Sequence, residues 1–326
     1  MKVKNREYLL LLILLAAATV YPAAADRYML SIGISILIMI LLGQSWNLMS
    51  GFAGQFSFGH AAFFGIGAYT SSILYVDYEI SPWIGMLAGM LLAAAVGALI
   101  GFLAFRYHLK GDFFALVTLA FAEILRVLFN NVKALKGAAG ILIPYRDVWQ
   151  EFQFKNDTCF YFVLLVMVVL ATGFIGIIRK RKFGLCLVAI RESQSAARAL
   201  GVPVLGYKLT AMAISAAAAA MCGTFYAQYY GFIDPGVVFA STISVEAIVP
   251  CIIGGSGTLC GPVWGALVIV PLQELSNTLF EGIGGINMII YGLLIVVFVM
   301  FCPRGIYGHI LQKLSERERK GADVKG

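Results

Sequence analysis

Apolar runs of about 20 residues recur along the whole chain, and short polar stretches separate them. A helix needs about 20 apolar residues to cross a hydrocarbon core about 30 Å thick, whereas a transmembrane strand needs a shorter segment of alternating polarity. The runs therefore predict an all-α polytopic integral membrane protein. We expect about ten transmembrane or re-entrant helical segments, at about residues 8–25, 28–49, 60–76, 83–105, 113–130, 159–178, 207–229, 243–254, 261–279 and 286–302.

Two regions differ from a plain membrane helix. A helix over residues 243–254 would be about 18 Å long at 1.5 Å per residue, which is too short to cross the hydrocarbon core. It would be re-entrant or one half of a broken helix. Residues 50–59 place glycine and polar residues at a membrane boundary, where irregular backbone is tolerated only if protein or a watery cavity covers it. Both regions are candidates for a pore.

The distribution of charge predicts the orientation of the segments. Only 13% of the residues are charged, against about 25% in soluble domains. With the N-terminus in the cytosol, 18 of the 24 Lys and Arg residues fall on the cytosolic side and five on the other. Cytosolic loops carry such an excess, so we expect both termini to be cytosolic. Because the cations flank membrane segments, the net charge of +7 does not indicate a nucleic-acid partner.

The two ends of the chain complete the predicted organisation. Residues 1–28 have a basic start, an apolar centre and an Ala-x-Ala-like end, which is also the pattern of a cleavable signal peptide. We favour an uncleaved first membrane helix, because the charge balance counted from residue 1 is consistent. Residues 1–306 then form a transmembrane domain that contains the cytosolic loop 179–208, and residues 307–326 form a charged cytosolic tail.

Motifs of nucleotide and hydrolytic chemistry are missing from the sequence. The glycine cluster at 254–262 has no lysine, so there is no P-loop for nucleotide phosphates, and no HExxH, nucleophile elbow or dinucleotide fingerprint occurs. The six cysteines show no CxxC or Cys/His metal spacing. We therefore expect no enzyme activity, no metal and no cofactor in this chain, and an energy source outside it.

A few charged residues interrupt the apolar runs. Ionisable groups in a membrane are expensive and are often functional. Glu123 and Arg126 are three residues apart, so they share a helix face and would pair, either in a transport pathway or as a structural ion pair. Glu246 would line the pathway or reach the interface, and Glu274 would reach the external interface.

The stretch SFGHAAFFGIGAY at 57–69 combines small and polar residues. Its glycines and alanines would allow another helix backbone to approach closely. Gln55, Ser57 and His60 at its start would face a pore or make interhelical hydrogen bonds. The external loop 131–158, with GAAGI and mixed charges, is either a landing site for an external partner or a solvated linker.

The most polar stretch, residues 179–208, begins with four cations that fix the end of the sixth segment in the cytosol. The sequence ESQSAARALG that follows predicts a short helix over 192–201, with Glu192 at its N-terminus and Gly201 at its end. An apolar strip would enter a groove on a partner, although a helix lying on the lipid surface is the alternative. The candidate coupling residues are Glu192, Ala196, Ala197, Leu200 and Gly201.

Four ordered motifs resemble the LivM-type permeases of branched-chain amino acid ABC transporters, and the resemblance extends over about residues 44–308. The motifs are GFAGQFSFGHAAFFGIGAYTSSIL (51–74), LKGDFFALVTLAFAEILRVLFNN (109–131), AIRESQSAARALGVPVLGYKLTAMAIS (189–215) and GGSGTLCGPVWGA (254–266). The resemblance implies a multi-pass subunit of the bacterial inner membrane. Its implied partners are a LivH-like sister permease, two ATP-binding cassette subunits and a periplasmic substrate-binding protein.

The resemblance also implies that 192–201 corresponds to the "EAA" coupling motif of importer permeases. Ser195 stands where that motif has glutamate, so a salt bridge from this position is impossible. A second departure is ALKGAAGI at 134–141, where relatives often carry a TGG-like run.

Motifs and resemblance together predict a permease subunit of an ABC importer for branched-chain or related hydrophobic amino acids. The expected substrate pathway includes Gln55, Ser57, Thr118, Glu123 and Glu246. A permease for urea or short-chain amides is the alternative within the family. A stand-alone proton-coupled carrier and a non-transporting receptor are alternatives from other classes.

Overall fold

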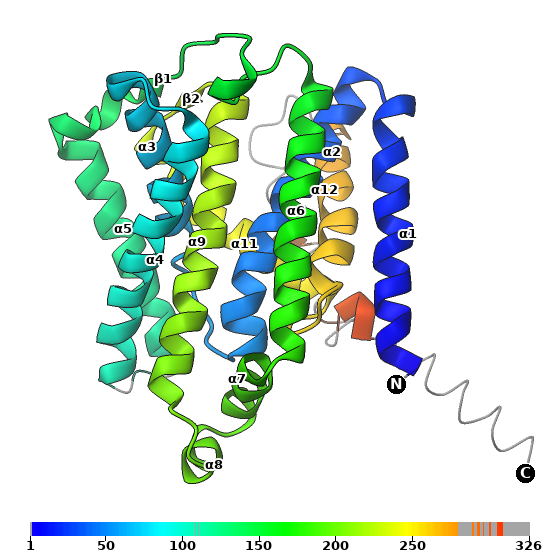
Figure 1. Ribbon diagram of the computed structural model, residues 1–326, viewed down its shortest axis with the longest axis vertical. Coiled ribbons are helices and arrows are strands. Elements are labelled where there is room, and N and C mark those ends of the chain that lie inside the picture. Colours follow the sequence, from blue (N-terminus) through cyan, green and yellow to red (C-terminus); the bar gives the residue numbers. More distant parts are fainter. Residues whose placement is uncertain are drawn as a thin grey trace, which may run out of the picture.

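The structure is a computed structural model in which the chain forms a bundle of long helices (Figure 1). It describes residues 2–107, 109, 111–279, 289, 292–293, 296, 300 and 305–308, with side chains from residue 10 onward. The long helices are α1 (Lys2–Ala24), α2 (Arg27–Trp46), α3 (His60–Tyr78), α4 (Pro82–Arg106), α5 (Asp112–Asn131), α6 (Asp157–Lys180), α9 (Val204–Tyr230), α11 (Ser241–Gly254) and α12 (Gly261–Leu279).

The first nine predicted membrane segments each correspond to one of these helices. Apart from the start of α1, the helix ends lie within about three residues of the predicted ends. The tenth segment, 286–302, falls almost wholly outside the described residues. Among the described helices, five stretches are long and apolar enough to cross a membrane: Arg27–Phe52, Pro82–Arg106, Asp157–Lys180, Val204–Tyr230 and Pro235–Gly254. The last stretch joins α10 (Pro235–Val238) to α11, so its length no longer requires a re-entrant helix.

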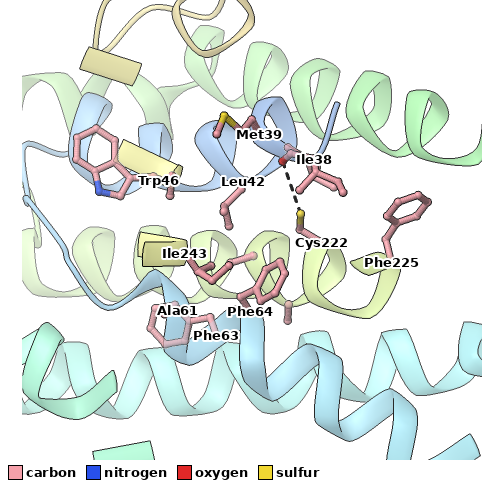
Figure 2. Close-up of a cluster of buried hydrophobic side chains, with 14 of the residues drawn as sticks. Ile38, Met39, Leu42, Trp46, Ala61, Phe63, Phe64, Cys222, Phe225 and Ile243 are labelled. Atoms are coloured by element: carbon pink, nitrogen blue, oxygen red, sulfur yellow. Dashed lines mark hydrogen bonds between the residues drawn. The ribbon is translucent and has the colours of Figure 1, made fainter. Parts of the chain in front are cut away.

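Helix α2 lies at the centre of one half of the bundle, where it packs against α6, α9, α11 and α12. It is apolar on nearly all sides, which is the pattern of a helix buried among other helices. The other half is a tight group of α3, α4 and α9. Figure 2 shows the apolar side chains between α2, α3 and α9, where the Cys222 thiol faces the carbonyl oxygen of Ile38 at 3.7 Å.

Small residues bring α3 and α9 into direct backbone contact, as the 57–69 stretch predicts. A Cβ atom added to Gly67 would overlap the carbonyl oxygen of Ala220, and one added to Gly223 would overlap the carbonyl oxygen of Phe64. The Thr224 hydroxyl donates to the Gly67 carbonyl at 3.0 Å. Close approach of this kind is how membrane helices associate when lipid removes the hydrophobic driving force.

Residues 131–158, the loop expected on the external side, form a packed cap rather than a loose linker. It contains three short 3₁₀ turns (Lys133–Leu135, Gly137–Ala139 and Trp149–Glu151) and strand β1 (Ile141–Leu142), which pairs antiparallel with β2 (Phe232–Ile233). This small ribbon is absent from the all-α prediction. The Phe152 ring stacks on Trp83 with centroids 4.1 Å apart, and the Tyr75 hydroxyl donates to Glu151 at 2.6 Å.

The two ends of the bundle differ in what they carry. The loop with β1 lies at one end of the bundle. The N-terminus of α1 lies at the other end, together with the short helices α7 (Lys182–Glu192) and α8 (Gln194–Ala199) (Figure 1). This arrangement places the N-terminus on the same side as the basic stretch 179–208.

Candidate coupling and pathway site

The basic stretch folds into two short helices, α7 (Lys182–Glu192) and α8 (Gln194–Ala199), which project from one end of the bundle (Figure 1). The prediction of a single helix over 192–201 is therefore wrong at its start. Glu192 ends α7, and Ser193 interrupts the helix with an extended backbone (φ −159°, ψ 111°). The Ser193 hydroxyl then accepts from the Ala196 amide, which caps α8.

The predicted coupling residues divide between the two faces of this hairpin. Ala197 is 2% exposed and packs with Ile190 and Val204, so it stabilises the hairpin from inside. Leu200 is 84% exposed, and Ala196 is exposed as well. Gly201 has φ +79° directly after α8, which confirms its expected place at the helix end. An accessible docking face would therefore consist of Ala196, Leu200 and Gly201.

Arg191 connects the hairpin to the interior of the bundle. Its guanidinium donates to the Gly51 carbonyl at 2.8 Å and to the Glu192 carboxylate at 2.9 Å. The space it occupies depends on two further glycines. A Cβ atom on Gly54 would come within 2.6 Å of Arg191 Cγ, and one on Gly257 would come within 2.5 Å of its Nη1. The sequence interpretation did not single out Arg191, because nothing along the chain links it to these distant glycines.

Gly54 and Gly257 belong to two irregular segments that we call the loop pair, residues 53–59 and 255–260. Gly51 lies just before the first segment. The first follows a π-helix (Asn47–Phe52) that continues α2, and the second joins α11 to α12. Asn47, in the π-helix, holds the second segment: its side-chain amide donates to the Thr258 carbonyl at 2.7 Å and accepts from the Gly257 amide at 2.8 Å. Gln44, one turn earlier, donates to the Leu259 carbonyl at 2.8 Å.

Three predicted pathway residues meet at the first segment of the loop pair. Gln55, Ser57 and Thr118 are all buried. The Thr118 hydroxyl accepts from the Phe58 amide at 3.0 Å, and the Ser57 carbonyl accepts from the Trp46 indole at 2.8 Å. These bonds fix the irregular backbone at depth, which is the condition under which it is tolerated in a membrane.

Lys208 is a further residue that the sequence interpretation did not assign to the site. It is 3% exposed, and its ammonium group donates to Gln55 Oε1 at 2.9 Å and lies 4.8 Å from the centre of the Phe105 ring. Its signal in the sequence is a cation inside the first turns of an apolar helix. Lys208 ties the start of α9, which follows the α7–α8 hairpin, to the loop pair.

His60 makes interhelical hydrogen bonds, which decides between its two predicted roles. Its Nε2 lies 2.9 Å from the Ser215 hydroxyl, which donates to the Ser45 carbonyl at 2.7 Å. The series connects α3, α9 and α2 in the buried interior. The backbone amide of Ala61 also donates to the Ser244 hydroxyl of α11 at 3.0 Å.

The two glutamates expected in the pathway lie apart from the loop pair. Glu123 pairs with Arg126 at 2.7 Å, as their spacing predicts, but both side chains are about 40% exposed on the outer side of α5. Glu246 lies on α11 near Tyr226 and Tyr230 of α9. Among the described residues, no side chain forms a hydrogen bond or ion pair with Glu246. Glu274 accepts from the Tyr28 hydroxyl at 3.4 Å.

A bundle of apolar helices, connected by buried polar loops and carrying a helical hairpin at one end, is the architecture of a multi-pass membrane protein. The family described as branched-chain amino acid transport system / permease component matches residues 28–299. The chain belongs to this family. Its similarity to LivM of Escherichia coli makes it a LivM-type permease.

Three relatives illustrate the similarity. The high-affinity branched-chain amino acid transport system permease protein LivM of Escherichia coli is 33% identical over 93% of this chain and 75% of its own length. LivH of the same organism is 24% identical over 82% of this chain and 90% of its own length. The probable LivM of Methanocaldococcus jannaschii is 22% identical over 84% of this chain and 93% of its own length. No solved structure matches the chain.

Proposed function

We propose that the chain is a LivM-type permease subunit of an ABC importer for branched-chain or related hydrophobic amino acids. The observation that carries this proposal is the similarity to LivM proteins over nearly the whole chain, together with the α7–α8 hairpin on the loop pair. The sister subunit would be a LivH-like permease, two ATP-binding cassette subunits would supply ATP hydrolysis, and a periplasmic binding protein would deliver the substrate.

The orientation follows from the charge bias of the sequence. The α7–α8 end would face the cytosol, both termini would lie on that side, and the chain would cross the bacterial inner membrane about ten times, including the retained first helix. The ATP-binding subunits would dock on the exposed Ala196, Leu200 and Gly201. The external cap of residues 131–158 would face the binding protein.

Coupling would pass from the hairpin to the loop pair through Arg191. A movement of α7 displaces the Arg191 side chain, whose guanidinium donates to the Gly51 carbonyl and lies against Gly257 in the second segment, and whose aliphatic part lies against Gly54. Asn47 then makes the π-helix that precedes the first segment move together with the second segment, because it bonds to the second segment in both directions. Each segment of the loop pair joins two long helices, so its displacement reorients the helix ends on either side of it. Alternating access would result from this movement.

The proposed pathway combines the loop pair with two more peripheral carboxylates. Gln55, Ser57 and Thr118 would shape it from within the bundle. Glu246 would border it beside α9. The exposed Glu123, with Arg126, would border a path only at the outer face of α5, where a sister permease would pack. A zwitterionic amino acid would meet amides and hydroxyls along most of this route, and weak binding there favours release.

Uptake by a reconstituted complex tests the proposal. Proteoliposomes that contain this chain, its sister permease and the ATP-binding subunits should accumulate radiolabelled leucine, isoleucine or valine when ATP and the loaded binding protein are supplied. Urea uptake in their place would favour the short-amide alternative. Uptake driven by a pH gradient, by the two permeases alone, would contradict an ABC importer and favour a proton-coupled carrier. An absence of flux in every assembly would favour a receptor.

A further inference from the structure

Helix α1 and the bundle enclose an apolar cavity of about 410 Å³, which we call the α1–α6 wedge. Its walls come from α1 (Leu11 to Ala18), from α6 (Leu165 to Lys180) and, at the back, from α2, α12 and Leu259. Thr172 and Lys180 are the polar residues among the lining side chains. The cavity also opens on the outer surface of the bundle, where a membrane protein meets lipid.

The wedge is closed at one end and charged at the other. At the closed end the Tyr161 hydroxyl donates to the Ala18 carbonyl at 2.9 Å, and the Tyr21 and Tyr161 rings stack with centroids 5.9 Å apart. At the other end Lys180 lines the cavity, next to Arg179, Arg181 and Lys182. The helices are thus joined about one turn from the start of α6, and the cavity extends from there toward the end of α6 that leads into α7.

The size of the wedge limits what can occupy it. The lining residues of α6, from Leu165 to Lys180, span about 22 Å at 1.5 Å per residue, which is longer than the roughly 15 Å of one leaflet's hydrocarbon but shorter than the whole core of about 30 Å. A further helix, about 10 Å across, does not fit between two helices that remain in contact at Tyr161. Water is disfavoured, because a buried water needs two to four polar partners. The buried Thr172 hydroxyl has no hydrogen-bond partner among the described residues.

We propose that the α1–α6 wedge binds one acyl chain of an anionic phospholipid from the leaflet on the α7–α8 side. The chain lies along Thr172, Gly173 and Gly176, and the phosphate lies at Lys180 in the basic cluster. An apolar wall that extends about 22 Å below four cations complements an extended acyl chain in shape and its anionic headgroup in charge. The inference depends on membrane insertion and is independent of the transported substrate.

Gly173 offers a way to fill the wedge without disturbing its walls. A Cβ atom added at Gly173 meets no atom within 4 Å, so Gly173→Leu would occupy the space of the acyl chain. Gly206 on α9 is a matched control, because it is also a helical glycine whose added Cβ meets nothing within 4 Å and it lies outside the wedge. Gly173→Ala is a milder version of the same change.

Photolabelling of the purified complex in vesicles tests the proposal. The probe is phosphatidylglycerol with a diazirine at the end of one acyl chain. Label in residues 165–177 is divided by label in residues 84–103 of α4, a stretch with one exposed face. We expect Gly173→Leu to lower this ratio about fivefold, Gly173→Ala to lower it less and Gly206→Leu to leave it unchanged. A phosphatidylcholine probe should label the wedge several-fold less, since each cation near the surface favours anionic lipid by roughly fivefold.

Three results would overturn the proposal. The first is an equal labelling ratio in wild type and Gly173→Leu. The second is equal labelling by the two headgroups, which would remove the role of the cations. The third is loss of the sister permease from the Gly173→Leu complex with lipid labelling retained, because that result would make the wedge a protein interface.

Discussion

Arg191→Ala is the substitution that most directly perturbs the contact between the hairpin and the loop pair. It removes a charged donor 2.8 Å from the Gly51 carbonyl and 2.9 Å from Glu192. A hydrogen bond to a charged group contributes about 1.5–3 kcal/mol, and the Arg191 side chain is 36% exposed, so the lower value applies. A loss of about 1.5 kcal/mol corresponds to roughly a tenfold change in an equilibrium.

The assay is the number of substrate molecules transported per ATP hydrolysed in proteoliposomes. We expect Arg191→Ala to lower transport about tenfold while the subunits still assemble and ATP is still hydrolysed. Arg191→Lys should fall between wild type and Arg191→Ala, because an ammonium group keeps the charge but lacks the planar fork that reaches two acceptors. Arg198→Ala is the control, since Arg198 is an exposed arginine on the neighbouring helix.

A second substitution separates coupling through the glycine contact from a general loss of stability. Gly54→Ala places a Cβ atom 2.6 Å from Arg191 Cγ, and it also strains a backbone with φ +67°. Arg191→Ala removes the Cγ atom that this Cβ would approach most closely. The loss of transport per ATP in the double variant should therefore be smaller than the sum of the losses in the two single variants. Additive effects, or equal transport per ATP in Arg191→Ala and Arg198→Ala, would refute transmission through this contact.

Three further predictions concern the hairpin and the packing around it. Gly201→Trp should abolish substrate-stimulated ATP hydrolysis while insertion into the membrane persists. The substitution adds bulk at the exposed end of α8 and strains a residue with φ +79°. Unchanged stimulation of ATP hydrolysis would show that this end of α8 is not the docking site. Gly67→Leu should destabilise the protein in detergent by about 3 kcal/mol, since its Cβ overlaps the Ala220 carbonyl, whereas Gly206→Leu should unfold at the wild-type temperature. Lys208→Met should lower the free energy of unfolding by about 1–3 kcal/mol, because it leaves Gln55 Oε1 without its donor. Adding Gln55→Leu should recover part of that stability. No recovery would mean that the loss does not come from the Lys208–Gln55 pair.

The helices could be predicted well because their signals are local. An apolar run of about 20 residues has one stable form in a bilayer, which is a helix that satisfies its own backbone. The close approach of α3 and α9 was also predictable in kind, since Gly67 lies in a stretch of small residues. The sequence did not identify Ala220 as the residue opposite Gly67, because helix pairing is a property of the folded bundle.

The site was less predictable because its contacts join distant parts of the chain. Arg191 and Gly51 are 140 residues apart, and Asn47 and Thr258 are 211 apart. Residues 182–192 lie in the predicted cytosolic loop 179–208, yet they form α7. Polar residues such as Gln55 and Ser57 were correctly marked as unusual for a membrane segment. Their partners, including the buried Lys208, could be found only in the structure.

ATP hydrolysis by the assembled complex tests the central claim most directly. Rates are compared with and without this chain, in the presence of the sister permease, the ATP-binding subunits and a binding protein loaded with leucine. The account predicts that hydrolysis rises with loaded binding protein only when this chain is present, and that Arg191→Ala separates this rise from leucine uptake. Leucine uptake driven by a pH gradient, with no ATP-binding subunit in the membrane, would contradict it.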